Sequence, residues 1–397
     1  MAVLNMRGTG SFAADHRPEN WRQKYLMLEP NGSAPLTAVL SMLPSEKTDD
    51  PEYHNFRKDL PNWTGLVKAG SDTIGASGAT GTKFEFTTSA DAGFCKAGQL
   101  WKNATTNEVV KVSSMTGNEA TIVRGVGNSG TGLAMLENQV MYMIGNVNAE
   151  GSAIPDAISY DAASTENYTQ IFRTPYSISR TAMHTNFRTG DQYLEKSRDA
   201  LKEHMVSMER AFMFGKKQSD AASLTERMTE GLFTAITTNM SDAASAFVTD
   251  NKVTEAEFDQ FLAEKAFAYG SSEKLALCGW KVAHFLQQIG KNRWQPVDYS
   301  DSSYGVSLTS YKTFAGTLQV KTHPMFRQIS GFENNMIILD TKDLRYRFID
   351  DTQLLKDRQA AGTDGVTDEY LTECGLEILQ EKTHGGILNW SVSPVAA

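Results

Sequence analysis

The residues of this sequence that are best suited to chemistry stand in the segment EHMVSMER, at positions 203–210. This segment places His204 beside Glu203 and puts Glu209 five positions further on. Histidine and glutamate can hold a metal ion together, but on a helix they must stand three or four positions apart. On a helix, His204 and Glu209 are about 140° apart, and Glu203 and His204 about 100°. We therefore interpret the segment as part of a structural helix with a charged outer face, with His204 at the edge of its apolar stripe.

Two glycine-rich segments resemble nucleotide-binding loops but lack the elements that such loops need around them. GVGNSG, residues 125–130, has the spacing G-x-G-x-x-G. A dinucleotide site also needs a crossover helix before the next parallel strand, and only about two helical turns would fit here. GASGATGTK, residues 75–83, lacks the Gly-Lys-Ser/Thr run of a phosphate loop. A turn between short strands is the expected role of GVGNSG.

Histidines and cysteines are too scattered to form a known metal or nucleophile motif. The seven histidines form no His-x-His or His-x-x-x-His pair, the three cysteines are far apart, and no G-x-S-x-G motif is present. The sequence therefore predicts no catalytic residue, no metal and no cofactor. A catalytic site can be assembled from residues that are far apart in sequence, and such a site needs no local motif. A soluble enzyme therefore stays as an alternative. A cleft lined by titratable groups that point toward one another would favour it.

Length, composition and charge describe an ordinary folded protein that is acidic overall. The chain has 397 residues, of which 40% are hydrophobic and 21% charged, and its formal net charge is −9. It has neither the basic surplus of a protein that grips DNA phosphates nor an apolar run long enough for a membrane span. The odd number of separated cysteines fits a reducing compartment, and the N-terminal residues lack the apolar region of a signal peptide.

The pattern of the chain predicts an arm, a small barrel, a long helix and a mixed α+β body, in that order. Residues 1–65 contain short periodic pieces between prolines, with aromatic residues that follow no helical stripe. Residues 75–151 are rich in Gly, Ser and Thr and contain short β-branched runs, which is typical of a small antiparallel barrel. A helix is expected to begin with a capping box at Thr189 and Gln192 and to end at Gly215.

Two faces are expected on this long helix. Five apolar residues spaced by seven, four, three and four positions should form its buried stripe, namely Leu194, Leu201, Met205, Met208 and Phe212. The charged residues are expected largely on the opposite face, namely Glu195, Lys196, Asp199, Lys202, Glu203, Glu209 and Arg210.

In their order along the chain, these segments resemble those of the major capsid proteins of tailed phages. PNGSAPLTAVLS (30–41) is similar to their N-terminal arm. Residues 97–152 resemble the small β-barrel that one branch carries in its extended loop, and ENYTQIFRTPYSISRTA (166–182) resembles the return of that loop. EKSRDALKEHMVSMERAFMFGKK (195–217) resembles their spine helix. Two further matching segments are RMTEGL (227–232) and LTECGLEILQEKTHGG (371–386).

The resemblance implies an α+β chain with the HK97-like fold of phage capsids. The regions that it implies are an N-terminal arm (1–65), an extended loop (66–188) with the barrel at about 75–151, the spine helix (189–224), an axial domain (225–345), and return strands of the peripheral domain with the C-terminus (346–397). It also implies a virion protein, assembled in the host cytoplasm, that forms hexamers and pentamers and then an icosahedral head. The head would enclose DNA without binding particular sequences, and no membrane is expected to take part. Scaffolding, portal or decoration proteins are further partners that the resemblance implies.

Six residues are candidates for contacts between subunits: Trp21, Tyr25, Phe56, Trp63, Trp101 and Arg124. The arm has no apolar stripe on which to bury its aromatic residues, and the barrel is the part of the loop that would reach a neighbour. One alternative is that residues 1–65 form a strap over their own domain. Another is a different virion protein, such as a tail or adaptor protein, which would form rings or tubes.

Overall fold

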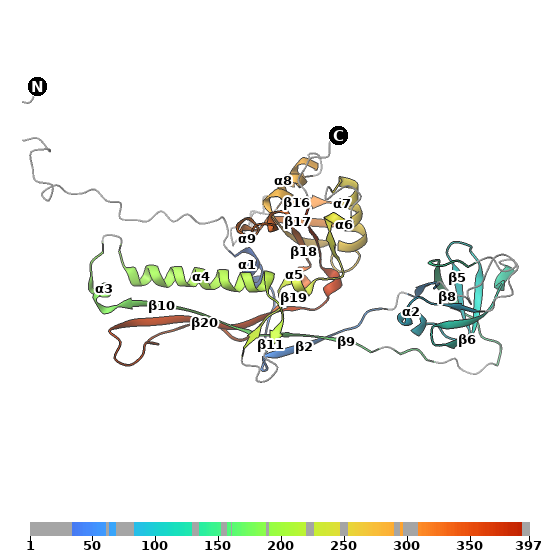
Figure 1. Cartoon of the computed structure of the whole chain (residues 1–397), viewed down its shortest axis with the longest axis horizontal. Helices are drawn as coiled ribbons and strands as arrows, with labels where there is room; N and C mark the ends of the chain where they lie inside the picture. Colours follow the sequence, from blue (N-terminus) through green and yellow to red (C-terminus); the bar gives the residue numbers. More distant parts are fainter. Residues whose placement is uncertain are drawn as a thin grey trace, which may run out of the picture. The chain divides into compact units, whose positions relative to one another are not determined.

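The computed structural model divides the chain into two compact units, and the sequence of the second interrupts that of the first (Figure 1). Unit 1 consists of residues 1–56 and 164–397, and unit 2 of residues 57–163. Helices and sheets are mixed in unit 1, which confirms the predicted α+β class. The structure describes residues 34–60, 63–68, 83–128, 135–151, 157–159, 161–187, 190–219, 226–246, 253–289, 294–296 and 309–390.

A four-stranded sheet of unit 1 supports the long helix α4, Gln192–Phe214. Its strands lie in the order β1-β19-β20-β10, and α4 runs along β10 and β20 (Figure 1). The strand bounds are β1 Ser45–Lys47, β10 Gln170–Ser179, β19 Leu344–Leu355 and β20 Gly365–Ile378. The ten residues of β10 pair with β20 along their whole length. This ribbon of about 34 Å matches the length of about 35 Å of the 23-residue helix.

The two ends of α4 are fixed by a side-chain cap and by close backbone packing. Asp191 is the N-cap, because its Oδ1 accepts hydrogen bonds from the backbone N–H groups of Tyr193 and Leu194 at 2.9 and 3.4 Å. The predicted cap at Thr189 is therefore wrong, and Thr189 itself lies outside the described residues. The predicted end is confirmed, since Gly215 is the C-cap, where a Cβ atom would collide with the carbonyl oxygens of Ala211 and Thr229.

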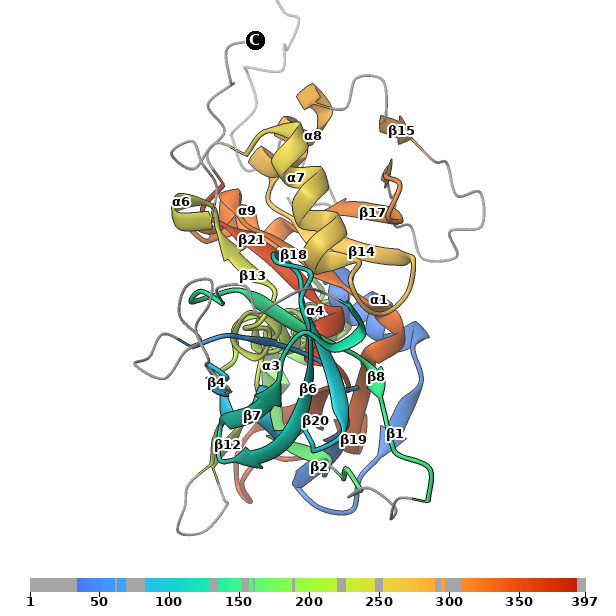
Figure 2. The same cartoon turned by 90° about the vertical axis from the view of Figure 1, so that its right-hand side faces the viewer.

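A seven-stranded sheet forms the second part of unit 1. Its order is β13-β21-β18-β14-β17-β16-β15. Helix α7 covers one face of it and buries Phe258 and Phe261 in the same apolar cluster as Ala276 of β14 and Leu318 of β17 (Figure 2). Thr254 and Glu257 form a capping box at the start of α7. The strand bounds are β13 Met240–Asp242, β14 Glu273–Cys278, β15 Trp294–Pro296, β16 Thr309–Lys312, β17 Thr317–Thr322, β18 Met336–Leu339 and β21 Gly385–Leu388.

Short helices and two small strand pairs complete unit 1. The helices are α1 Pro35–Met42, α3 Arg180–His184, α5 Leu232–Ala235, α6 Ala243–Ala246, α7 Glu255–Phe261, α8 Trp280–Ile289 and α9 Pro324–Gln328, with single turns η4 Leu262–Ala266, η5 Phe332–Asn334, η6 Thr341–Asp343 and η7 Glu381–Thr383. The strand pairs are β2 Glu52–Arg57 with β9 Ala163–Tyr168, and β11 Gln218–Ser219 with β12 Arg227–Met228.

Among the described residues, no helix combines the length and the apolar character that a membrane crossing requires.

Unit 2 is a small barrel. Its six strands lie in the order β3-β8-β5-β6-β7-β4, and an antiparallel bridge between Val67 and Phe86 joins the two edges. The strand bounds are β3 Thr64–Leu66, β4 Lys83–Glu85, β5 Gln99–Asn103, β6 Val109–Thr116, β7 Glu119–Val123 and β8 Val140–Asn146, with the helices α2 Ser89–Gly93 and η3 Val126–Asn128. The barrel also includes β3, which lies before the expected start at about residue 75. The sequence does not predict this strand, because three residues are too few to show a period.

The seven-stranded part of unit 1 contains a buried neutral histidine, His384. Its Nδ1 atom accepts a hydrogen bond of 3.0 Å from the backbone N–H of Asp340, and its Nε2 atom is buried without a hydrogen-bond partner among the described residues. Burial, with the nearby Lys274 cation, lowers the pKa of His384 to about 4, although Asp340 and Glu381 oppose this. The imidazole is therefore uncharged at neutral pH.

We expect unit 1 to lose stability as the pH falls from 6.5 towards 4. In this window the unfolded chain binds a proton at His384 that the folded chain excludes, so the free energy of unfolding falls by up to roughly 3 kcal/mol. Urea denaturation at neutral pH and near the lower end of the window measures the change. A His384→Asn variant should show a smaller difference between the two conditions, and an equal difference would contradict this assignment.

Candidate assembly site

From its start to its centre, α4 packs on its sheet largely through polar side chains. His204 is fully buried, with its two ring nitrogens 3.0 Å from Thr174 Oγ1 on β10 and 2.7 Å from Thr372 Oγ1 on β20. Burial lowers the pKa of His204, which favours the neutral ring, with one nitrogen donating and the other accepting. Nearer the start of the helix, Tyr193 donates to Asp368, and Ser197 lies 2.9 Å from the hydroxyl of Tyr370.

The predicted apolar stripe is only half covered within the subunit. Met208 and Phe212, in the C-terminal half of α4, are 2% and 0% exposed and belong to a cluster with Leu36 and Leu40 of α1. Leu194 and Leu201 are 51% and 37% exposed. The expectation that the whole stripe is buried is therefore wrong for its first half, because polar residues occupy the surface that faces the sheet there.

Glu209 anchors α1 to α4 from a fully buried position. Its Oε1 accepts from the backbone N–H of Leu36 at 2.7 Å, and its Oε2 accepts from the N–H and the hydroxyl of Thr37 at 2.6 and 2.5 Å. The expectation that Glu209 lies on the solvent face is wrong. The carboxylate satisfies N–H groups in the first turn of α1, which have no partner within that helix, and a negative charge is also favourable there.

His323 completes the buried shell around this carboxylate. It is also fully buried, and its Nε2 atom lies 2.8 Å from Glu209 Oε1. Its Nδ1 atom accepts a hydrogen bond of 3.2 Å from the backbone N–H of Met325, so the ring proton of the neutral tautomer is on Nε2 and is donated to Glu209. One glutamate therefore holds together α1, α4 and the start of α9. The sequence offered no signal for this cluster, because its members are far apart along the chain.

The candidate contact residues fall into three groups in the structure. Trp21 and Tyr25 lie outside the described residues. Phe56, at the end of β2, is 77% exposed and stays a candidate. Trp63 is half-buried, with its ring centroid 5.9 Å from that of Phe94, and also stays a candidate. The third group is the pair Trp101 and Arg124.

Trp101 and Arg124 are engaged within unit 2. Trp101 is fully buried in the barrel, and its indole N–H donates to Gln99 at 3.1 Å. Arg124 makes a two-pronged ion pair with the buried Glu108, with N–O distances of 2.8 and 2.6 Å. Both side chains are largely buried within unit 2, so neither is proposed as a contact between subunits. Aromatic and arginine residues are common in interfaces, but the same types also build cores, and sequence alone does not separate the two uses.

The cysteines are poor candidates for catalysis. Cys95, Cys278 and Cys374 are free and buried. Burial raises the pKa of each thiol to about 12, so all three are protonated at neutral pH and are weak nucleophiles. Their role is to fill the apolar clusters to which they belong.

Comparisons with known proteins place the chain among phage major capsid proteins. The major capsid protein of Pseudomonas phage PaMx41 is 26% identical over 330 residues, which cover 81% of this chain and 76% of that protein. Residues 7–391 match the model of the SU10 major capsid protein family. The chain belongs to this family and is the major capsid protein of a phage. The predicted class of protein is thereby confirmed.

Solved capsid structures align with most of the chain at low sequence identity. A chain from Mycobacterium phage Adephagia aligns with a TM-score of 0.46 and 10% identity, covering 94% of this chain and 95% of that one. A chain from the capsid of a native GTA particle aligns with a TM-score of 0.46 and 9% identity, covering 97% and 99%.

Proposed function

We propose that this capsid protein assembles with copies of itself into hexamers and pentamers, which close into the icosahedral head of a tailed phage around double-stranded DNA. Head assembly would take place in the host cytoplasm, with scaffolding, portal or decoration proteins as further partners. The net charge of −9 favours a container that encloses DNA without binding particular sequences. The family membership supports a structural role for the chain.

The observation that carries this proposal is the half-covered stripe of α4. A single subunit leaves Leu194 and Leu201 exposed, although they continue the line of apolar side chains that α1 covers further along the helix. Burial of apolar surface is the main driving force of protein association. A second copy of the chain is the occupant that we propose for this face, and closure of a shell multiplies weak contacts because each subunit engages several neighbours.

We also propose that the chain is divided into the five regions that the resemblance implies, each with its own structural role. Residues 1–65 would be the arm, 66–188 the extended loop, 189–224 the spine helix, 225–345 the axial domain and 346–397 the return strands. Two features support this proposal. Residues 57–163 form a compact unit of their own, and α1 is tied to α4 through Glu209.

A double variant tests the proposed interface. Leu194→Ser/Leu201→Ser should abolish rings and closed particles in negative-stain electron microscopy, while unfolding of the free subunit changes little because both side chains are already exposed. The matched control is Lys196→Ser/Glu203→Ser, which changes two exposed residues of the same helix at the same spacing. Normal particles from the leucine variant, or equal loss of particles from the control, would contradict the proposed contact.

A further inference from the structure

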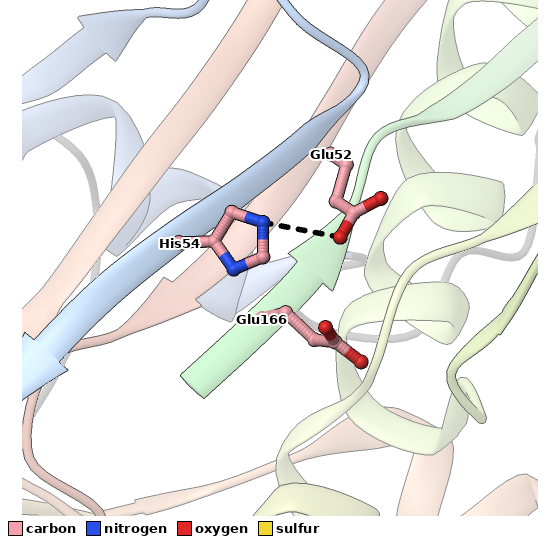
Figure 3. A group of neighbouring side chains, drawn as sticks. All are labelled: Glu52, His54 and Glu166. Carbon is pink, nitrogen blue, oxygen red and sulfur yellow. Dashed lines mark ion pairs between the residues drawn. The ribbon is translucent and has the colours of Figure 1, made fainter. Parts of the chain in front are cut away.

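Three side chains with metal-binding atoms converge on the strand pair β2–β9 (Figure 3). Glu52 and His54 come from β2, and Glu166 comes from β9. One ligand atom from each residue lies within 4.8 Å of the other two, and His54 Nε2 is 3.1 Å from Glu52 Oε1. His54 is exposed and the two glutamates are half-buried, so water can reach the cluster.

The alternation of side chains along both strands brings these three residues together. Tyr53 and Asn55 of β2 turn toward the C-terminal end of β20, where they donate hydrogen bonds to the backbone carbonyls of Leu376 and Ile378, each at 2.9 Å. Asn167 of β9 donates to the same carbonyl of Leu376 at 2.7 Å. Successive side chains in a strand point to opposite faces, so the residues next to these three meet on the other face.

We propose that Glu52, His54 and Glu166 form a binding site for a divalent transition-metal ion such as Zn²⁺. One imidazole nitrogen and two carboxylate oxygens suit zinc and its neighbours, whereas Ca²⁺ and Mg²⁺ prefer sites made of oxygen atoms only. Water would complete the coordination at this accessible surface. Sequence spacing misses such a site because Glu166 is far from the Glu-x-His pair along the chain.

Lys217 is the cation that competes for this site. Its Nζ atom lies 3.3 Å from Glu166 Oε1 and 3.4 Å from the backbone carbonyl of Glu166. It partly neutralises the Glu166 carboxylate when no metal ion is bound, and it engages one of the two oxygens through which Glu166 could bind a metal ion. Removing this ammonium group should therefore strengthen metal binding.

The position of the cluster suggests what the ion would do. The chain leaves unit 1 along β2 and re-enters it along β9. β2 and β9 form a sheet of two strands, which has few backbone hydrogen bonds to hold it together besides the side-chain bonds to β20. A metal ion bound to side chains of both strands would hold them together, an effect that a single subunit would show without assembly.

Titration of the full-length, metal-free and unassembled protein with ZnCl₂ by isothermal calorimetry tests the site. Wild-type protein should bind one ion per chain at a saturable site. His54→Ala and Glu166→Gln should each weaken binding by roughly tenfold or more. The matched control is His184→Ala, which removes an exposed histidine at the end of α3. Lys217→Met should bind Zn²⁺ more tightly than the wild type.

Hydrogen exchange of the same samples provides a second readout. Zn²⁺ should slow exchange in β2 and β9 of the wild type and of His184→Ala, but not of His54→Ala. Exchange of the metal-free variants shows whether the strands stay paired, and if Glu166→Gln loosens them, Glu52→Gln replaces it. Binding that survives both His54→Ala and Glu166→Gln, or falls equally in His184→Ala, would overturn the site in favour of nonspecific surface binding. Absence of any binding in the wild type would also overturn it.

Discussion

A Glu209→Ala variant should lower the free energy of unfolding of unit 1 by about 3–5 kcal/mol, because it leaves several donors of a buried hydrogen-bonded cluster without an acceptor. Four donors would lose their acceptor, namely the backbone N–H groups of Leu36 and Thr37, the Thr37 hydroxyl and the His323 Nε2–H. Leu36 and His323 are fully buried, so their N–H groups could reach water only if α1 or α9 moved, whereas Thr37 is half-buried. The smallest rearrangement that would expose the unpaired donors of α1 to water is the separation of α1 from α4.

Urea denaturation and hydrogen exchange measure the two parts of this expectation. The denaturation midpoint should fall, and exchange in residues 35–42 should accelerate more than in the centre of α4. Glu203→Ala is the matched control, since it removes the same side chain from an exposed position of the same helix and should change stability by less than about 0.5 kcal/mol. A Glu209→Ala variant as stable as this control, with unchanged exchange in α1, would refute the anchor.

The second large effect is expected in unit 2. Trp101→Ala removes the largest fully buried side chain of the barrel core and should lower the stability of unit 2 by about 3–5 kcal/mol. Phe86 packs edge-on against the indole, with ring centroids 5.2 Å apart, and would lose that contact as well. Because unit 2 has its own apolar cluster, the loss should stay within residues 57–163.

Hydrogen exchange followed peptide by peptide distinguishes a core role from a contact role for Trp101. Strands β5 to β8 should exchange faster in the free subunit of Trp101→Ala, while α4 and β20 keep wild-type rates. Phe56→Ala is the control, because Phe56 is 77% exposed and its removal should leave exchange in the free subunit unchanged. Wild-type exchange in the barrel of Trp101→Ala would return Trp101 to the candidates for contacts between subunits.

Much of the architecture follows from local patterns in the sequence. The β-branched runs and turn residues of the barrel, the helix that ends at Gly215 and the capping box of α7 are set by neighbours within a few positions. The class of protein could also be predicted, because the order of segments along the chain is itself information that sequence contains. A strand as short as β3 cannot be predicted from periodicity, since three residues show no period.

The roles of individual side chains on α4 were decided by packing between distant segments. The sequence determined a helix with five apolar residues on one line, but α1 and the sheet determined which of them are buried. It also placed Glu209 among the charged residues of the solvent face. Burial of that carboxylate is favourable only because α1 and His323 donate hydrogen bonds to it. The physical reason is that helix formation depends on residues three or four positions apart, whereas burial and hydrogen bonding of a side chain depend on segments that the chain brings together from far away.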